Sequence, residues 1–157
     1  MNILVIGAGG VGTSMAAIAE SRNFFRTFTL ADVSLEAAQR AIEKLTDAQR
    51  FNAVQLDARS ESNIVALIKE CDADFVVNAC DPRLNEPIFN ACFTAGVHYM
   101  DLAMNLSTPH ATDPYNQVGE ILGHKQLSAH QAWIDKGLLA LVGMGVEPGL
   151  SDVFARY

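Results

Sequence analysis

The sequence predicts an α/β fold in which helices cover both faces of a parallel sheet. Short apolar runs rich in β-branched residues alternate with helix-like segments at intervals of about 20 to 30 residues, which is typical of repeated βαβ units. A glycine-rich turn follows the first of these runs. Half of the 157 residues are hydrophobic, which is enough to build the core of one domain.

The opening stretch organises the rest of the chain. Residues 3–6 form a continuous apolar run, typical of a strand that is buried on both faces. Gly7, Gly9 and Gly12 follow with the spacing Gly-x-Gly-x-x-Gly, and a helix-like segment covers 13–22. In this context the glycines permit a tight turn, the approach of a pyrophosphate to the backbone, and close packing of helix on sheet. We therefore expect a dinucleotide-binding loop made of Gly7, Ala8, Gly9, Gly10, Val11 and Gly12.

The next elements follow from short apolar runs and from helical spacing. Ser34 and Ser60 are suitable N-caps, and the apolar residues after each recur at the spacing of a helix. Gly96 is expected to end another helix at 86–95. The strands between these helices are expected at 27–31, 53–56 and 75–79.

The last third of the chain predicts two more strands, at 97–102 and 138–142. Residues 107–114 are polar and contain two prolines, which indicates a loop. We expect 115–136 to be mostly helical up to Gly137, and another helix to cover 150–157. Six strands of this kind predict a Rossmann-type doubly wound sheet with strand order 3-2-1-4-5-6, in a three-layer αβα arrangement.

Composition excludes several classes of protein. The net charge is −7, and no run of Lys or Arg is typical of a nucleic-acid or anionic-membrane surface. The cysteines are odd in number and lack metal-ligand spacing, which argues against a disulfide framework. No cleavable leader pattern and no long apolar span are evident. We therefore expect a cytoplasmic protein that binds neither nucleic acid nor membrane.

Asp32 closes the second strand, 20 residues after Gly12. In a doubly wound sheet the ligand lies along the carboxyl ends of the strands, where an acid can accept hydrogen bonds from both hydroxyls of the adenosine ribose. The same carboxylate would repel a 2′-phosphate, so NAD is expected rather than NADP, and Val33 is assigned to the same site. Nearby basic residues leave room for NADP (Arg22, Arg26 and Arg40). The alternative is that Asp32 only caps the following turn.

Two further strand ends are expected to line the cofactor. Asp57 is placed near the amino group of the adenine and Ala58 beside its ring, with a simple turn aspartate as the alternative. Asn78, Ala79 and Cys80 are placed beside the nicotinamide ribose, where small side chains let the backbone approach. Asn78 is equally well explained as a side chain that satisfies buried loop backbone, and Cys80 as a packing cysteine.

Candidate catalytic residues follow the last two strands. Asp101 ends the fifth strand and Glu147 follows the sixth, so both belong to loops that open on the same crevice. Hydride transfer at an amine carbon needs a proton acceptor and a group that orients the substrate, and a carboxylate can do either. Loop or helix capping is the alternative for both. No metal is expected, because the four histidines are not arranged on one face with a carboxylate.

Four segments together resemble the N-terminal nucleotide domain of the saccharopine dehydrogenase family. These are residues 7–12, the pair Asn78-Ala79, the run His98-Tyr99-Met100-Asp101-Leu102-Ala103, and the turn Gly145-Val146-Glu147-Pro148-Gly149. The family includes saccharopine reductases, lysine 6-dehydrogenases and carboxynorspermidine dehydrogenases, which oxidise or reductively form amines on amino acids with NAD(P). The resemblance implies an NAD(P)-dependent oxidoreductase, with Glu147 matching an acid associated with the active site of saccharopine reductases. Those reductases carry a tyrosine in the loop after the fifth strand, and residues 101–105 contain none, which favours another amine substrate.

The resemblance also implies a separate substrate domain. We expect residues 1–157 to be the NAD(P)-binding domain of a longer protein. This domain alone should show little turnover, and the full-length protein should bind a small amino-acid substrate. A homodimer is left open. The alternative is a non-catalytic NAD(H)-sensing domain, like the regulatory domains of potassium transport systems. A short-chain epimerase or reductase lacks support, because no Tyr-x-x-x-Lys pair is present.

Overall fold

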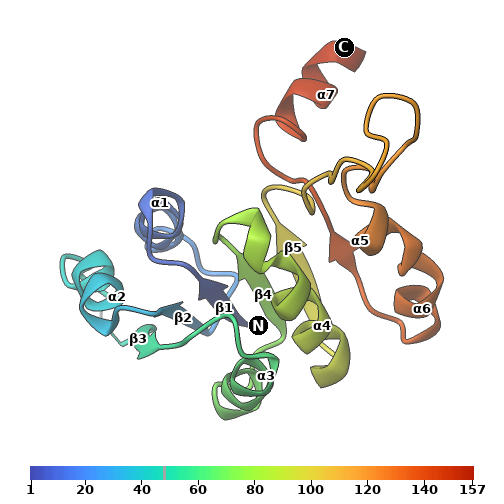
Figure 1. Cartoon of the computed structure of the whole chain (residues 1–157). Coiled ribbons are helices and arrows are strands. Elements are labelled where there is room, and N and C mark those ends of the chain that lie inside the picture. Colours follow the sequence, from blue (N-terminus) through green and yellow to red (C-terminus); the bar gives the residue numbers. More distant parts are fainter. Residues whose placement is uncertain (48) are drawn as a thin grey trace.

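A six-stranded parallel sheet in the order β3-β2-β1-β4-β5-β6 forms the centre of the computed structural model (Figure 1). The structure describes residues 1–47 and 49–157. The strands are β1 (Asn2–Ile6), β2 (Thr27–Asp32), β3 (Phe51–Gln55), β4 (Phe75–Asn78), β5 (His98–Asp101) and β6 (Ala140–Leu141). Every neighbouring pair is parallel, so the predicted Rossmann-type order is confirmed.

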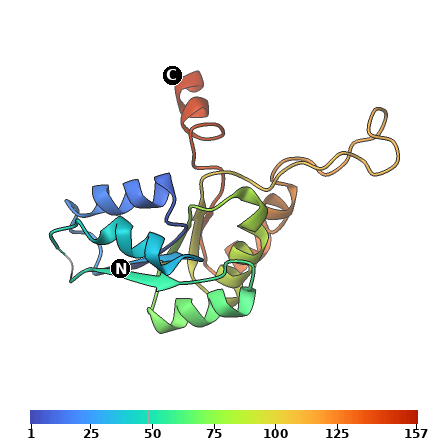
Figure 2. The ribbon, with the colours of Figure 1, turned by 60° about the vertical axis from the view of Figure 1, so that its left-hand side comes forward.

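Helices lie on both faces of this sheet (Figures 1 and 2). They are α1 (Gly10–Ala19), α2 (Leu35–Ile42), α3 (Glu61–Glu70), α4 (Asn85–Ala95), α5 (His124–Ser128), α6 (His130–Asp135) and α7 (Leu150–Arg156), with a 3-10 turn η1 (Pro82–Leu84) before α4. The expected caps are present: the Ser34 and Ser60 hydroxyls accept hydrogen bonds from the backbone N–H groups of Ala37 and Asn63. Gly96 ends α4 in the left-handed conformation.

The core has two parts, one on each face of the sheet, as expected for strands with apolar side chains on both sides. On one face α1 and α2 pack through Ala16 and Ala38 against Val5 and Leu30, next to a group of phenylalanines. On the other face α3, α4 and α6 cover the sheet. There the ring of Trp133 lies 4.8 Å from that of Phe89 and 6.3 Å from that of Tyr99, centroid to centroid. Among the described residues no helix is long and apolar enough to cross a membrane.

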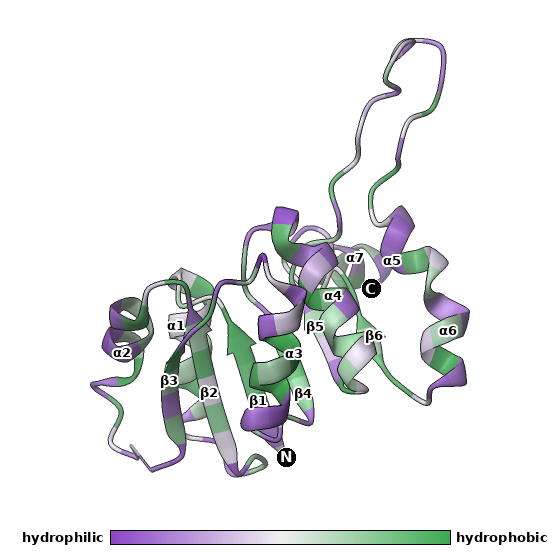
Figure 3. Cartoon of the chain, turned by 60° about the horizontal axis from the view of Figure 1, so that its bottom comes forward, coloured by the Kyte–Doolittle hydropathy of each residue, from purple (hydrophilic) through white to green (hydrophobic). Residues whose placement is uncertain are grey.

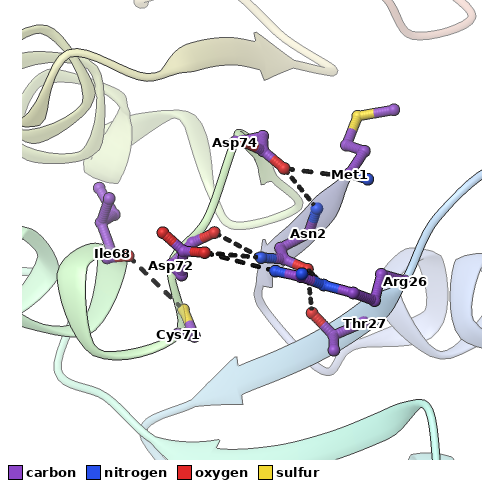
Figure 4. Close-up of polar contacts among 8 residues, drawn as sticks. All are labelled: Met1, Asn2, Arg26, Thr27, Ile68, Cys71, Asp72 and Asp74. Atoms are coloured by element: carbon purple, nitrogen blue, oxygen red, sulfur yellow. Dashed lines mark hydrogen bonds and ion pairs between the residues drawn. The ribbon is translucent and has the colours of Figure 1, made fainter.

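Polar contacts join the amino-terminal ends of three central strands (Figure 4). The amide of Asn2 donates to the backbone carbonyl of Asp72 at 2.7 Å, and its oxygen accepts from Arg26 and Thr27. The carboxylate of Asp74 accepts from the backbone N–H of Asn2 at 2.6 Å. These bonds hold the starts of β1, β2 and β4 level with one another, while the opposite, carboxyl edge of the sheet is where the chain forms its longer loops.

The prediction of helix over most of 115–136 is wrong. Residues 104–123 instead project from the sheet as a long excursion, which we call the arm (Figures 2 and 3), and only α5 and α6 are helical. In the arm Thr108 and Glu120 exchange two backbone hydrogen bonds of 2.8 Å. At Gly119 a Cβ atom would lie 2.1 Å from the carbonyl oxygen of Thr108, so only glycine permits this pairing. Gly123 has a positive φ of 71°, which breaks any helix before α5.

The other predicted elements are present with shifted ends. Helix α1 begins at Gly10 rather than at residue 13, because the glycine loop itself forms its first turn. Strand β3 begins at Phe51, and β6 is confined to Ala140–Leu141. The final helix α7 runs from Leu150 to Arg156, and the carboxylate of Asp152 accepts a hydrogen bond from the backbone N–H of Gly149 at its start.

Candidate functional site: a cavity at the carboxyl edge of the sheet

A cavity of about 440 Å³ lies where the first four strands end. Most of the residues expected to bind the cofactor line it together: Gly7, Gly9, Asp32, Val33, Asp57, Ala58, Ala79 and Cys80. Ile6, Leu56, Arg59, Asp81 and Leu84 complete the wall. The cavity spans the position where the strand order reverses between β1 and β4, which is where doubly wound folds bind their ligands.

The three motif glycines differ in what surrounds them. Gly7 has a φ of 110°, and a Cβ there would lie 2.7 Å from the carbonyl oxygen of Ala79. A Cβ on Gly12 would lie 1.9 Å from the carbonyl oxygen of Gly7, so this glycine is required for α1 to pack against the loop. A Cβ on Gly9 meets no atom within 4 Å. Gly7 and Gly12 are therefore required by the fold, whereas Gly9 leaves open space beside the cavity.

Three backbone hydrogen-bond donors follow Gly9 at the start of α1. Gly9 is the N-cap, and its carbonyl already accepts the first helical bond from the N–H of Thr13 at 2.9 Å. The N–H groups of Gly10, Val11 and Gly12 have no partner within the helix, because no turn precedes them. A helix start with donors and a partial positive charge binds a diphosphate well. Gly10, Val11 and Gly12 themselves do not line the cavity, so any contact they make with a ligand would be through their backbone N–H groups.

Asp32 connects the second strand to the glycine loop. One carboxylate oxygen accepts a hydrogen bond from the N–H of Ala8 at 2.8 Å, and the other accepts from the N–H of Ser34 at 2.9 Å. The expected capping role is thus present, and Asp32 also lines the cavity. Because each carboxylate oxygen can accept more than one hydrogen bond, both remain able to bind ribose hydroxyls.

The loop after β3 carries a tight ion pair. The guanidinium of Arg59 donates to both carboxylate oxygens of Asp57, at 2.9 Å from Nε and 2.7 Å from a terminal nitrogen, and the backbone N–H of Arg59 donates at 3.0 Å. The hydrogen bond from Arg59 lowers the pKa of Asp57 to about 2. Asp57 lines the cavity as expected, but its oxygens are already occupied by Arg59.

Asn78 ends β4 in the interior and is 1% exposed. Its oxygen accepts from the N–H of Cys80 at 3.0 Å, and its amide donates to the side chain of Asn85 at 2.7 Å. This geometry favours the alternative interpretation, in which the Asn78 side chain forms hydrogen bonds to buried loop backbone. Ala79 and Cys80, in contrast, line the cavity. Burial, with the nearby charge of Asp32 adding to it, raises the pKa of the Cys80 thiol to about 11, so the thiol is neutral near pH 7.

Asp101 lies in a buried polar network that joins β5 to the loops around it. It is 1% exposed, and it accepts hydrogen bonds from the hydroxyl of Tyr99 at 2.9 Å, from the amide of Gln126 at 2.5 Å and from the backbone N–H of Gly143 at 2.7 Å. Burial raises the pKa of Asp101 above its usual range. Asp101 is outside the set of residues that line the cavity, and this placement favours the structural alternative over direct contact with a substrate.

Glu147 is exposed on the turn that follows β6. This turn is fixed by close backbone contacts: a Cβ on Gly145 would lie 2.2 Å from the carbonyl oxygen of Leu102, and the N–H of Gly145 donates to the carbonyl of Pro148 at 3.1 Å. The peptide bond between Glu147 and Pro148 is cis. The turn, the arm and α7 all extend from the carboxyl edge of the sheet (Figure 1). Glu147 itself is not part of the cavity wall.

Sequence reasoning missed Arg59 and Asp81 in the cavity wall. Both residues follow the end of a strand closely, and the fold brings such positions to the carboxyl edge of the sheet. Their position after a strand was therefore the sequence feature that could have predicted them. Asp81 pairs with Arg83 just as Asp57 pairs with Arg59. Across the described residues, no group of three or more His, Cys, Asp and Glu side chains is arranged to hold a metal ion.

Comparison with known families identifies this arrangement. Residues 3–141 match the family model described as the saccharopine dehydrogenase NADP binding domain. The chain belongs to the saccharopine dehydrogenase family. It is therefore an NAD(P)-binding domain of the saccharopine dehydrogenase type, and the alternative of a potassium-transport regulatory domain has no support.

Curated relatives in this family are considerably longer than the chain. A carboxynorspermidine synthase of Vibrio cholerae is 31% identical over 100% of the chain, which corresponds to 39% of that protein. A carboxyaminopropylagmatine dehydrogenase of Synechocystis is 28% identical over 99% of the chain and 37% of that protein. The chain thus spans less than half the length of the relatives it matches.

Solved structures support the fold. An apo saccharopine dehydrogenase (L-Glu forming) from Saccharomyces cerevisiae superposes on 98% of this chain and 29% of its own, with a TM-score of 0.72 at 15% identity. A dTDP-glucose 4,6-dehydratase from Bacillus anthracis, solved in complex with NAD, covers 90% of this chain and 53% of its own, with a TM-score of 0.64 at 12% identity. At these identities the likeness concerns the arrangement of the strands and helices.

Proposed function

We propose that the chain is the NAD-binding domain of an oxidoreductase that transfers hydride between nicotinamide and a carbon bearing an amine. The observation that carries this proposal is that Gly7 and Gly9 of the glycine loop and Asp32 at the end of β2 line one cavity at the strand-order reversal. The residues present fit a dinucleotide: Gly9 leaves space for a diphosphate beside unpaired N–H groups, and Asp32 stands one strand away for the ribose.

The charges around the cavity favour NAD over NADP. Its wall contains the carboxylates Asp32, Asp57 and Asp81 and a single guanidinium, that of Arg59. Arg59 is itself neutralised by Asp57. A 2′-phosphate would add two negative charges close to Asp32, whereas free ribose hydroxyls can donate to its carboxylate.

Bound NAD would supply the hydride acceptor or donor, and the chain's own residues would bind and orient it. The backbone of Gly9 to Gly12 would hold the diphosphate, Asp32 with Val33 the adenosine ribose, and Ala79 with Cys80 the ribose on the nicotinamide side. We assign substrate contact to Glu147, which is exposed beyond β6. Asp101 would then act by holding the Gly143 end of that turn in position.

For the whole protein we propose a carboxylated amine as the substrate class. The sequence relatives are named as enzymes of carboxynorspermidine and carboxyaminopropylagmatine chemistry. The absence of a tyrosine in residues 101–105 argues against saccharopine itself. The substrate-binding residues would belong to a further domain, so the chain alone should bind cofactor with little turnover.

Titration with NADH and NADPH, followed by nicotinamide fluorescence, tests this proposal. We expect saturable binding of NADH by the chain and weaker binding of NADPH. A well-folded chain that binds neither would contradict the assignment of the cavity, and tighter binding of NADPH would contradict the role given to Asp32. The substrate class is tested separately, by NAD(P)H oxidation assays of the full-length protein with polyamine-derived and lysine-derived imines.

A further inference from the structure

We infer that Arg59 is a ligand-binding residue that covers the adenine ring of the bound dinucleotide. The inference rests on the proposed function and goes beyond it, because it assigns the adenine contact to Arg59 in place of Asp57. It starts from the position of the Asp57–Arg59 pair in the cavity wall, on the loop after β3.

Asp57 is poorly suited to accept the adenine amino group. One of its oxygens accepts from the backbone N–H and from Nε of Arg59, and the other accepts from a terminal guanidinium nitrogen at 2.7 Å and from Nε at 3.2 Å, so each oxygen already has two donors. A carboxylate that is held in this bidentate way has little capacity left for another donor. The side chain facing the ligand with unused capacity is therefore that of Arg59.

Arg59 is well suited to lie over a base. Pairing along one edge holds the guanidinium plane fixed, and 77% of the side chain remains exposed. A planar, weakly hydrated cation stacks favourably on aromatic faces. The same arrangement occurs elsewhere in the chain: Arg50, which pairs with Asp47, lies over the ring of Phe25 with its guanidinium carbon 4.6 Å from the ring centroid.

The cavity wall next to Asp57 also contains an apolar surface, which we call the floor and which is appropriate for a base. Leu56 and Ala58 flank Asp57 and line the cavity, and they are only 5% and 7% exposed. An adenine ring between this floor and the guanidinium would be enclosed on both faces. Because Asp32 stands on the ribose side with its negative charge, the free face of Arg59 is better matched to the base than to a 2′-phosphate.

The experiment measures the Kd values of four ligands for the wild-type chain and for Arg59→Ala. The ligands are NADH, NADPH, ADP-ribose and reduced nicotinamide mononucleotide. We expect the Kd values of the first three to rise by the same factor, about three- to tenfold, because all carry adenine. The affinity for reduced nicotinamide mononucleotide should not change. Arg59→Lys, which keeps the charge without the planar group, should lose most of the same affinity.

Arg83→Ala is the matched control. Arg83 forms the same kind of pair with Asp81 and is equally exposed, but it is not part of the cavity wall. We expect a change of less than twofold. Arg59→Ala leaves the carboxylate of Asp57 unpaired in the cavity wall, where it could itself contact the ligand. The double variant Asp57→Ala/Arg59→Ala removes that carboxylate as well, and it should lose at least as much affinity as the single variant.

The outcomes are distinct. A loss restricted to NADPH would overturn the inference by showing that Arg59 contacts a 2′-phosphate. Unchanged affinities in folded Arg59→Ala, or full retention in Arg59→Lys, would also overturn it. A wild-type chain that binds none of the adenine-containing ligands would refute the proposed function instead.

Discussion

The carboxylate of Asp32 accepts a hydrogen bond of 2.8 Å from the backbone N–H of Ala8, so the acid at the end of β2 is bonded to the glycine loop after β1. The residue to which we assign the ribose is therefore also bonded to the loop to which we assign the diphosphate. Changes at Asp32 should affect both parts of the ligand, and the stability of the loop as well.

Asp32→Asn should weaken NADH binding by about tenfold and NADPH binding by less, because a charge-assisted bond to the ribose is lost while repulsion of a 2′-phosphate is relieved. The single amide oxygen can serve only one of Ala8 and Ser34 well, so the free energy of unfolding should also fall, by about 1–2 kcal/mol. Fluorescence titration and urea unfolding measure the two effects. An unaltered ratio of the two Kd values would contradict this role for Asp32.

Gly9→Ala and Gly12→Ala should separate binding from folding. A Cβ at Gly9 meets no protein atom within 4 Å, so the variant should fold and lose NADH affinity by at least about tenfold. A Cβ at Gly12 would lie 1.9 Å from a backbone oxygen, so that variant should lose about 3 kcal/mol or more of stability. Thermal unfolding and NADH titration of both variants provide the comparison. Equal stabilities would show that this packing argument is wrong.

Asp101→Asn should be destabilising, with a cost that depends on pH. Its amide would face the hydroxyl of Tyr99 and the amide of Gln126, and a buried group without its partner costs about 1–3 kcal/mol. Burial raises the pKa of Asp101, so the contribution of its carboxyl group is complete below the unfolded pKa of about 3.9 and decreases as the pH rises through the folded value. The deficit of the variant should therefore shrink as the pH rises above the unfolded pKa of about 3.9. Urea unfolding at several pH values tests this, and a deficit that increases with pH would contradict it.

Cys80 should react slowly with thiol reagents even though it lines the cavity. Its pKa of about 11 leaves little thiolate at pH 8, so alkylation should accelerate about tenfold for each pH unit until the pH approaches that value. NADH should protect this thiol if the nicotinamide-side assignment is right. Iodoacetamide labelling of Cys80, followed by mass spectrometry with and without NADH, measures both effects. The buried Cys92 serves as the internal reference.

The sequence was most informative where backbone chemistry leaves few alternatives. The alternation of six apolar strands with helices predicted the strand order, and the glycine spacing and Asp32 predicted much of the cavity, because these features are required by burial or by close backbone approach. The surroundings of Asp101 and the structure of residues 115–136 could not be predicted in this way. The partners of Asp101 come from Gln126 and Gly143, distant in sequence, and helical spacing in 115–136 was overridden by the pairing of Thr108 with Glu120. The place of Arg59 in the cavity wall was missed because its pair with Asp57 forms only when the loop folds.

The arm has a practical consequence for handling the protein. It is closed by two backbone hydrogen bonds between Thr108 and Glu120, and Tyr115 near its tip is 96% exposed. Chymotrypsin should therefore cut the chain first after Tyr115. The two fragments should stay associated, because the pairing of β5 with β6 and the bond from Gln126 to Asp101 cross the break. Limited proteolysis would thus yield a nicked domain whose cofactor cavity is intact.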